Sequence, residues 1–558
     1  MSACRVIRAA ALLLLACDGP ASTVGAGGTS APAPQGGDRP DPAGDAAADP
    51  GDAAVPRDVF LAPSDLGVVL DFAALPDFGP LGADTGRVPD AAPPTTDGPP
   101  ALRLLPSAVQ LREAREPAVV RVDLIGDASA GPFSVAFGAT GGLAVSPEHA
   151  SLSAENRSVV LRLTAPIDAD ADDAFGRVTA SAEGLAAVSV PFAVSDAHLT
   201  WEMGLDADAL QFVRSSNDKT RRLTVTNTFN GRPAPAAEIN LRGKGTLVCP
   251  RRSFTVRFDH PVHLQDSPPL EDVVLLSMCE DPLVLRSRIS LEILARLDLF
   301  PSWFSYVELR YGEETRGVYL MVERPRKALA RVSPVLTQVI RRLNDSDVEI
   351  DYPDPDSIAD LESFLGPYRA IFGLQSVLQG DLLLAELMRR MLYDQYLLLL
   401  AYQSVLENGD YIDELYFYDR PAPPGRPGAE VPFFGVMAWD QDETFRRCHT
   451  PAPIADPLLN CAESRLDRLV VTQPPVRALY VTQLRRLLEG PTSAESLAAV
   501  SARAAAELAV YLDRPGVRAL HVVEDQPPPE AEAARATYLE LARARRETLQ
   551  AALQAEAP

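Results

Sequence analysis

The sequence predicts a multidomain chain in which an all-β sandwich at residues 101–196 precedes an α+β domain at 197–558. Three observations support this prediction. The chain has 558 residues, 46% of them hydrophobic, which is enough for several domains that each bury a core. Residues 101–196 are short runs of alternating polarity separated by Gly, Pro, Asp and Ser, as in antiparallel sheets. From residue 197, strand-like and helical segments alternate before long apolar helices follow.

Residues 1–17 have the layout of an export signal. Arg5 and Arg8 precede an apolar stretch that is too short to span a membrane as a mature helix. The stretch ends in Leu-Leu-Ala-Cys, which resembles a bacterial lipobox in which Cys17 carries a lipid, and the alternative is an ordinary signal peptide with a chance cysteine. We therefore expect an exported lipoprotein, anchored to the bacterial cell envelope on its periplasmic or cell-surface face.

Residues 18–100 are rich in Ala, Pro, Gly and Asp and contain almost no aromatic residues. Such a segment cannot bury enough apolar surface to offset its chain entropy, so we expect a disordered linker. The net charge of the whole chain is −24. This charge argues against a nucleic-acid partner held by general electrostatics, because phosphates would be repelled.

Four cysteines remain outside the export signal. Because export implies an oxidising compartment, we expect them to form disulfides. Proximity in the sequence favours the pairs Cys249–Cys279 and Cys448–Cys461. No Cys-x-x-Cys pair occurs, so their spacing does not suit zinc.

The predicted sandwich resembles the immunoglobulin-like modules of bacterial surface proteins, without a Cys-Trp-Cys signature. It contains an acidic run from Asp168 to Asp173. This run is either a solvated loop, which we favour, or a Ca²⁺ site.

The first half of the α+β domain predicts strands, one helix and a hairpin, which together make a small lobe. The helix is expected over 282–297, with Asp281 as N-cap and Pro282 as its first residue. Its apolar residues recur every four positions: Leu285, Ile289, Ile293 and Leu297.

The second half is mainly helical. Residues 382–407 predict a long helix, apolar on most faces and broken once, that lies at the centre of a domain. At the C-terminus, a helix is expected to turn three residues inward: Tyr538, Leu541 and Leu549.

Two strands after the long helix are expected to bring carboxylates together. A hairpin would place Asp410 at the start of the first strand, and Asp440 and Asp442 at the end of the second. If the second strand continues past Trp439, both aspartates point to one side while the indole packs away from them. Carboxylates without Cys or His suit Mg²⁺ or Mn²⁺, which in turn suit phosphates. The alternative is an acidic turn after an edge strand.

Four motifs in this region resemble the CotH, or spore-coat protein H type, atypical protein kinases. The resemblance covers about 200 to 555, and the motifs follow the family's order. They are "LRGKGT" with "CPRRSFTVRF", "EDPLVLRSRISLEILARLDL", "YVELRYGEETRGVYLMVE", and "ENGDYIDELYFYD" with "FFGVMAWDQDETF". The resemblance implies a two-lobed, α+β, atypical protein-kinase-like domain after the immunoglobulin-like sandwich.

The resemblance also implies roles for individual residues. Asp410 would be the catalytic aspartate that orients or deprotonates the acceptor hydroxyl, and Asp440 and Asp442 would hold the metal. The residues implied at the nucleotide are Arg242, Gly243 and Lys244, with Gly245, over the phosphates, then Arg251 and Arg252, and Glu323 beside the adenine. For Glu323 a solvated strand end is the alternative.

The chain departs from the family pattern in two places. Arg251 and Arg252 stand where the family places lysine, and the planar guanidinium is not a faithful replacement for a compact ammonium. Either Lys244 substitutes or activity is reduced. After Asp410, the family commonly has asparagine where this chain has Asp413 and Glu414, which we expect to change metal affinity.

The function implied is an ATP- and Mg²⁺- or Mn²⁺-dependent protein kinase that phosphorylates Ser, Thr or Tyr of exported proteins, or itself. The alternative is a catalytically degenerate kinase-like lipoprotein with a structural or adhesive role. Phosphotransfer to sugars or lipids also stays open.

Overall fold

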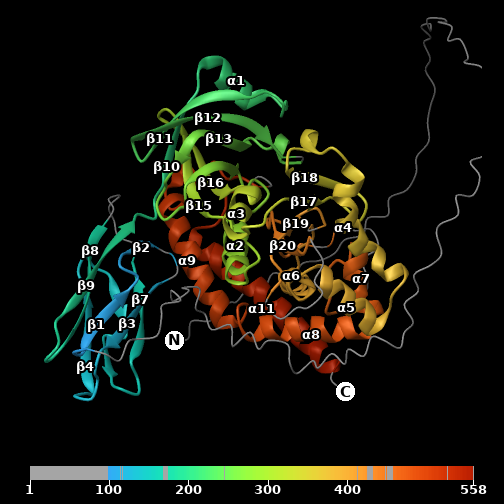
Figure 1. The fold of residues 1–558 in the computed structure, drawn as a ribbon. Helices are drawn as coiled ribbons and strands as arrows, with labels where there is room; N and C mark the ends of the chain where they lie inside the picture. The colour runs from blue at the N-terminus through green and yellow to red at the C-terminus, as the bar shows by residue number, and fades with distance from the viewer. Residues whose placement is uncertain are drawn as a thin grey trace, which may run out of the picture. The chain divides into compact units, whose positions relative to one another are not determined.

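The computed structural model describes residues 98–556, apart from 114, 116, 167–173, 244, 411, 424–431, 447, 449–455 and 524–525 (Figure 1). All described residues belong to one compact unit, Asp77–Pro558. Several predictions lie outside the described residues: the export signal with Cys17, the linker up to residue 97, the run from Asp168 to Asp173, and Lys244.

The first nine strands form two sheets around a common core, and we call this part the β module. One sheet has the order β1 (Ala101–Leu105), β3 (Ala118–Ile125), β7 (Ser158–Thr164) and β5 (Ala144–Ser146). The other has the order β2 (Val109–Arg112), β9 (Val188–Ser195), β8 (Ala174–Ala182), β4 (Phe133–Ala139) and β6 (His149–Leu152). Val122 and Leu161 of the first sheet and Val135 and Val178 of the second are fully buried in one cluster. Alternation along each strand therefore gives both sheets an apolar face directed to the shared core.

The next seven strands close into a barrel. Their order is β10 (Thr200–Gly204), β11 (Leu223–Phe229), β12 (Arg232–Arg242), β13 (Ser253–Val262), β14 (Leu270–Leu276), β16 (Glu314–Glu323) and β15 (Phe304–Tyr311), and β15 pairs in parallel with β10. Helix α1 (Ala207–Ser215) connects β10 to β11. Trp201 is fully buried in the barrel, where its Nε1 donates to Asn227 Oδ1 at 3.0 Å and its ring contacts Phe229 and Phe258. The hairpin of β15 and β16 matches the prediction from the sequence.

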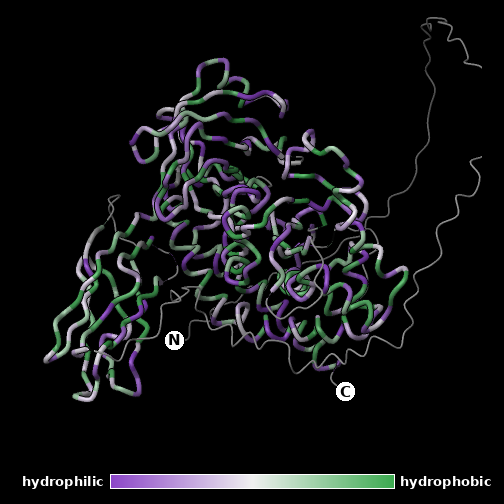
Figure 2. Tube along the Cα trace, in the orientation of Figure 1, coloured by the Kyte–Doolittle hydropathy of each residue, from purple (hydrophilic) through white to green (hydrophobic). Residues whose placement is uncertain are grey.

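The remaining elements form a mainly helical body around a small sheet. The sheet has the order β18 (Val348–Tyr352), β17 (Val339–Arg342), β19 (Leu415–Asp419) and β20 (Phe434–Ala438). The helices are α2 (Arg286–Arg296), α3 (Pro325–Val332), α4 (Leu361–Gly373), α5 (Gly380–Arg390), α6 (Tyr393–Val405), α7 (Arg465–Thr472), α8 (Pro474–Glu489), α9 (Ala494–Leu512), α10 (Pro515–Arg518) and α11 (Ala531–Ala555). One apolar cluster joins these helices to the sheet, and Figure 2 shows long hydrophobic stretches in the same helices. The described chain is thus a mixed α/β, multidomain arrangement.

Helix α2 begins later than the sequence predicts. The helix starts at Arg286, because Val284 has φ of +57° and interrupts the helical backbone. Asp281 is therefore not the N-cap, although its carboxylate still accepts from the backbone N–H of Leu283 at 2.9 Å and of Arg286 at 2.8 Å. The predicted apolar face is confirmed, since Leu285, Ile289, Ile293 and Leu297 are all buried.

The predicted break in the long apolar helix is confirmed. Helix α5 ends at Arg390 and α6 begins at Tyr393, and in the gap the backbone N–H of Leu392 donates to Phe434 O at 2.8 Å. Helix α6 is buried on nearly every face, as its composition indicated.

In α11, Tyr538 and Leu549 are buried as predicted, but Leu541 is 36% exposed, so that part of the prediction is wrong. Ala542, one position further along, takes the inward place instead. None of the described helices combines the length and hydropathy that a membrane crossing requires.

His521 hydrogen-bonds to the backbone of β16 where that strand has no neighbour. β14 pairs with β16 only as far as Leu320. Val318 of β16 therefore has a strand partner on the β15 side but none on the β14 side. The side chain of His521 accepts from Val318 N–H at 2.8 Å, and Arg251 donates to Val318 O at 2.9 Å. His521 is 1% exposed, and its burial, followed by the nearby charge of Arg251, holds its pKa well below 6.5.

We expect acid to destabilise the protein through His521. Its folded-state pKa is depressed, so below about pH 6.5 the unfolded chain binds a proton that the folded chain does not, and stability falls by up to about 1.4 kcal/mol per pH unit. His521→Gln keeps an acceptor for Val318 N–H and should remove this part of the pH dependence. The measurement is thermal unfolding between pH 5 and pH 8.

The matched control is His149→Gln, at an exposed histidine of β6. This variant should retain the pH dependence of the native chain. Equal slopes for native protein and His521→Gln would show that His521 does not carry the effect.

Candidate functional site

The segments before β19 and after β20 are joined by hydrogen bonds. Leu415 pairs with Ala438, so the segment before β19 and the segment after β20 leave the sheet together. The backbone N–H of Gly409 donates to Glu443 O at 3.1 Å, and Asn408 Nδ2 donates to Gln441 Oε1 at 3.4 Å. The Asp410 loop and the segment of Asp440 and Asp442 are therefore brought together, as the hairpin predicted.

The two aspartates predicted to bind metal, Asp440 and Asp442, are not placed by a continuing strand. β20 ends at Ala438, and Asp440 has φ of +26°, which lies outside extended geometry. The prediction that strand alternation aligns Asp440 with Asp442 is therefore wrong. The backbone after the strand is held instead by Trp439 N–H donating to Glu414 O at 2.8 Å, and by Gln441 Nε2 donating to Trp439 O at 2.6 Å.

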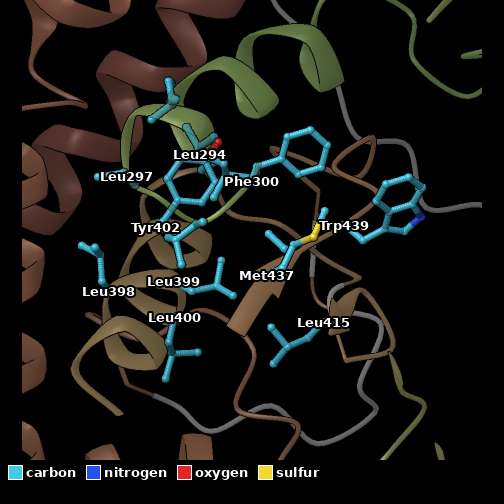
Figure 3. Packing of buried hydrophobic residues seen from close by; sticks show 14 of the residues in the cluster. Leu294, Leu297, Phe300, Leu398, Leu399, Leu400, Tyr402, Leu415, Met437 and Trp439 are labelled. Carbon is cyan, nitrogen blue, oxygen red and sulfur yellow. The ribbon is translucent and has the colours of Figure 1, made fainter. Parts of the chain in front are cut away.

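Trp439 anchors this loop to the core. It is 3% exposed and stacks on Phe300, with ring centroids 6.1 Å apart. Figure 3 shows Trp439 at one side of the apolar cluster that includes Phe300 and Met437. The guanidinium of Arg242 lies 5.9 Å from its ring centre, on the barrel side. A residue of the barrel and a residue of the hairpin thus meet at the indole.

A small pocket lies behind the loop. The residues that line it are Leu276, Ser287, Leu291, Phe300, Val322, Trp439, Asp440 and Gln441. These residues come from two barrel strands, from α2, from the segment between α2 and β15, and from the segment after β20, so the loop packs where these elements converge.

The carboxylates of the site repel one another. Burial and then the charge of Asp413 raise the pKa of Asp440, while Arg242 and Arg341 oppose the increase. Burial, followed by the charge of Asp440, holds the pKa of Asp442 well above its usual value. Such mutual repulsion is what a bound cation would relieve.

The donor set fits a divalent metal with few protein ligands. Among the residues that the structure describes, no group of three or more His, Cys, Asp or Glu side chains is arranged to hold a metal ion. Asp440 and Asp442 alone match the way Mg²⁺ is commonly bound, through one or two carboxylates together with substrate phosphates and water.

Two arginines of β17 hold the acidic segment before β19, and the sequence reasoning missed both. Arg341 donates to Asp413 O at 2.6 Å and to Glu414 Oε1 at 2.9 Å. Arg342 donates to Ile412 O at 2.7 Å. No local motif marks these arginines, because they reach the site only through the pairing of β17 with β19.

Gly243 follows directly after β12, where its backbone needs a glycine. Its φ is +109°, and a Cβ at this position would lie 2.1 Å from Thr246 Oγ1. Lys219 Nζ donates to Gly243 O at 3.1 Å. The predicted phosphate segment is therefore a tight turn into the 3₁₀ helix Gly245–Val248, with Lys244 outside the described residues.

Arg251 and Arg252 have different surroundings. Arg251 is 5% exposed, donates to the backbone carbonyls of Val318 and Ser277, and lies over the ring of Tyr319. Burial lowers the pKa of Arg251 to about 10. Arg252 has buried Nε and Nη1 atoms without a hydrogen-bond partner among the described residues. Arg251 is thus bonded to the barrel itself, whereas Arg252 has buried donors that no described residue satisfies.

Glu323, at the end of β16, is buried. It is 1% exposed, accepts from Trp303 N–H at 3.1 Å and pairs with Arg331. The alternative of a solvated strand end is therefore wrong. Its carboxylate ties β16 to the start of β15 and to α3.

Both predicted disulfides are confirmed. Cys249–Cys279 joins the segment after the Gly243 turn to the residue before Glu280 and Asp281. Cys448–Cys461 joins the segment that follows the aspartates to the residues that lead into α7. Each bridge lies beside a loop of the site.

Residues 239–516 match the family described as CotH kinase protein. This part of the chain is a CotH domain. The match begins inside β12 and ends inside α10, so β10, β11 and α11 lie outside it.

Other comparisons add no argument to the CotH match. No curated protein matches the chain. Among solved structures, the E. coli chaperone DraB is 13% identical, covers 30% of this chain and 93% of its own, and has a TM-score of 0.15. The periplasmic chaperone SfaE is 10% identical, covers 26% of this chain and 95% of its own, and has a TM-score of 0.16. TM-scores this low carry no argument about this chain.

We expect Gly243→Ala to destabilise the CotH domain more than Gly231→Ala. Both glycines have positive φ, but open space surrounds a Cβ at Gly231, at the other end of β12, whereas at Gly243 it meets Thr246. The shared backbone strain costs about 1–2 kcal/mol, and the contact adds to it. Thermal unfolding measures the difference.

The double variant Gly243→Ala with Thr246→Ala removes the contact and should recover the additional loss. Equal losses for Gly231→Ala and Gly243→Ala would show that Thr246 relaxes freely and that the turn is not tightly packed.

Proposed function

We propose that the chain is an ATP- and divalent-metal-dependent phosphotransferase, a protein kinase of the CotH type. The observation that carries the proposal is the hydrogen-bonded union of the Asp410 loop with the segment of Asp440 and Asp442. These bonds support a candidate base near two buried carboxylates, of which Asp440 helps to raise the pKa of Asp442.

In this proposal Asp410 orients the acceptor hydroxyl and takes its proton. It is half-buried at the end of a loop whose backbone is fixed by Asn408 and Gly409, so its carboxylate is held in place while substrate can still approach. Fixed groups of this kind contribute positioning, which dominates catalysis of phosphoryl transfer.

Asp440 and Asp442 would hold Mg²⁺ or Mn²⁺, which when bound neutralises charge on the nucleotide phosphates. Arg242 lies on the barrel side of the loop and its charge already acts on Asp440. Arg252, with donors unpartnered among the described residues, is the second cation available to phosphate. Arg251 is bonded to carbonyl groups of the barrel, so we do not assign it to the nucleotide.

The cellular setting proposed here rests on the sequence. Residues 1–17 and Cys17 support an exported lipoprotein, the β module supports an immunoglobulin-like spacer, and the two disulfides fit an oxidising compartment. The proposed acceptor is a Ser, Thr or Tyr of an exported protein or of the chain itself.

The test is transfer of labelled phosphate from ATP with Mg²⁺ or Mn²⁺ by the full chain, compared with Asp410→Asn and Asp442→Asn. Each variant should lower transfer by at least about 100-fold, because it removes a charged group that acts on the reacting phosphoryl group or its acceptor. The pKa of Asp442 is raised, so its charged form is disfavoured in the folded state. Asp442→Asn should therefore keep or raise the melting temperature while it abolishes transfer.

Glu540→Gln, at an exposed position of α11, is the matched control and should change neither property. Mg²⁺ should raise the melting temperature of the native chain more than that of Asp442→Asn. Absence of transfer by the native chain, with no thermal shift from Mg²⁺ and ATP, would contradict the proposal and favour the degenerate, binding role.

A further inference from the structure

A buried glutamate links the β module to the CotH domain. Glu507 of α9 is fully buried, and its two carboxylate oxygens have different partners. Oε1 pairs with Arg112 at the end of β2, and Oε2 accepts from Arg288 Nε of α2 at 2.9 Å. The side chain of Arg112 is also fully buried. One carboxylate of the CotH domain is therefore shared between α2 and the β module.

The same residues continue into a row of charges along α2. Arg288 Nη1 donates to Glu292 Oε2 at 2.6 Å. The other oxygen of Glu292 accepts from Arg296 at 2.9 Å and from Arg503 of α9 at 2.6 Å. Helix α2 is thus fixed against α9 by directed ionic bonds in addition to apolar packing.

The segment next to Arg112 adds further bonds to the CotH domain. Arg115 donates to Phe304 O and lies over the ring of Phe304, 4.7 Å from its centre. Burial, with the charges of Arg288 and Arg112, lowers the pKa of Arg115 to about 9. The positive charges of Arg112, Arg115 and Arg288 therefore lie around Glu507, whose negative charge offsets their mutual repulsion.

A neighbouring face of α2 lines the pocket beside Asp440. Ser287 and Leu291 line the pocket that also contains Asp440 and Gln441. Residues 287 and 291 precede 288 and 292 by one position each, so a rotation of α2 that moves the ionic side also moves the pocket side.

The energetics make this contact sensitive to loss of one partner. Removal of Arg112 would take away the cation bonded to Oε1, which would keep only the 3.5 Å contact from the backbone N–H of Tyr306. Loss of one partner of a buried ion pair is more disruptive than replacement of the whole pair by apolar groups. Because Oε2 of the same carboxylate accepts from Arg288 of α2 at 2.9 Å, a shift of Glu507 would act directly on a bond that holds α2.

We infer that Arg112 and Glu507 are positioning residues, through which the β module holds α2 and with it the Asp440 loop in the geometry that phosphoryl transfer requires. The β module is then an integral part of the catalytic unit and not only a spacer. This inference rests on the proposed function for its activity readout, but the structural link can be tested without it.

The experiment compares the full native chain with Arg112→Met, an apolar replacement of similar length. Backbone hydrogen exchange should increase in α2 and in residues 439–443, both far in sequence from the substitution. In the transfer assay, at a temperature where the variant is folded, kcat should fall by about tenfold or more, as expected for a misplaced catalytic group. Arg112→Lys keeps the charge and should recover part of both losses.

The matched control is Arg103→Met, which removes a 2.7 Å ion pair with Asp123 inside the β module and leaves Glu507 untouched. It should lower the melting temperature without changing exchange in α2 or kcat. Unchanged exchange in α2 and in residues 439–443 for folded Arg112→Met would overturn the inference. If Arg112→Met does not fold, Arg112→Lys becomes the deciding variant with the same two readouts.

The two proposals fail in different ways. A native chain that transfers no phosphate contradicts the kinase proposal, while the exchange comparison still decides whether Arg112 holds α2. If the native chain is active, and Arg112→Met has the same activity and the same hydrogen exchange in α2 and in residues 439–443, the kinase proposal stands. The inference about Arg112 is then wrong.

Discussion

The carboxylates at the end of the β19–β20 hairpin repel one another, and the surrounding structure has to offset this repulsion. Asp413, Glu414, Asp440 and Asp442 come together with little solvent, and burial alone raises the pKa of several of them. The opposing charges come from other elements, Arg341 from β17 and Arg242 from the barrel. The acidic loops are thus stable only while the small sheet and the barrel stay in contact with them.

Arginine carries this compensation because one guanidinium can bond several acceptors in a fixed plane. Arg341 serves a backbone carbonyl and a carboxylate at once, and Arg251 serves two carbonyls that lie beyond the end of β14. A lysine at position 251 would offer these two carbonyls a single nitrogen in place of the two nitrogens that Arg251 uses. Of the two arginines that stand where the family has lysine, Arg251 therefore has a structural role in the barrel. Arg252 has buried donors without a hydrogen-bond partner among the described residues.

Features that depend on a local pattern could be predicted from the sequence. Features that depend on contacts between distant segments could not. Both disulfides, the break between α5 and α6 and the hairpin of β15 and β16 were predictable, because each follows from spacing or periodicity over a few residues. The start of α2 and the alignment of Asp440 were not, because Val284 and Asp440 adopt positive φ under constraints from their surroundings. The partners of Arg341 and Glu507 could not be found at all, since they depend on sheet pairing and helix packing across long separations.

Helix α2 shows why a buried ionic contact can do what apolar packing alone does not. Leucine and isoleucine side chains fix the distance between two helices, but they tolerate small rotations because their contacts are not directional. Hydrogen-bonded charges have preferred angles, so the bonds from Arg288 to Glu507 and from Arg503 to Glu292 fix the rotation of α2 about its own axis. Since Ser287 and Leu291 lie one position away and face the pocket beside Asp440, the rotation set on the ionic side also determines the geometry on the side of the active site.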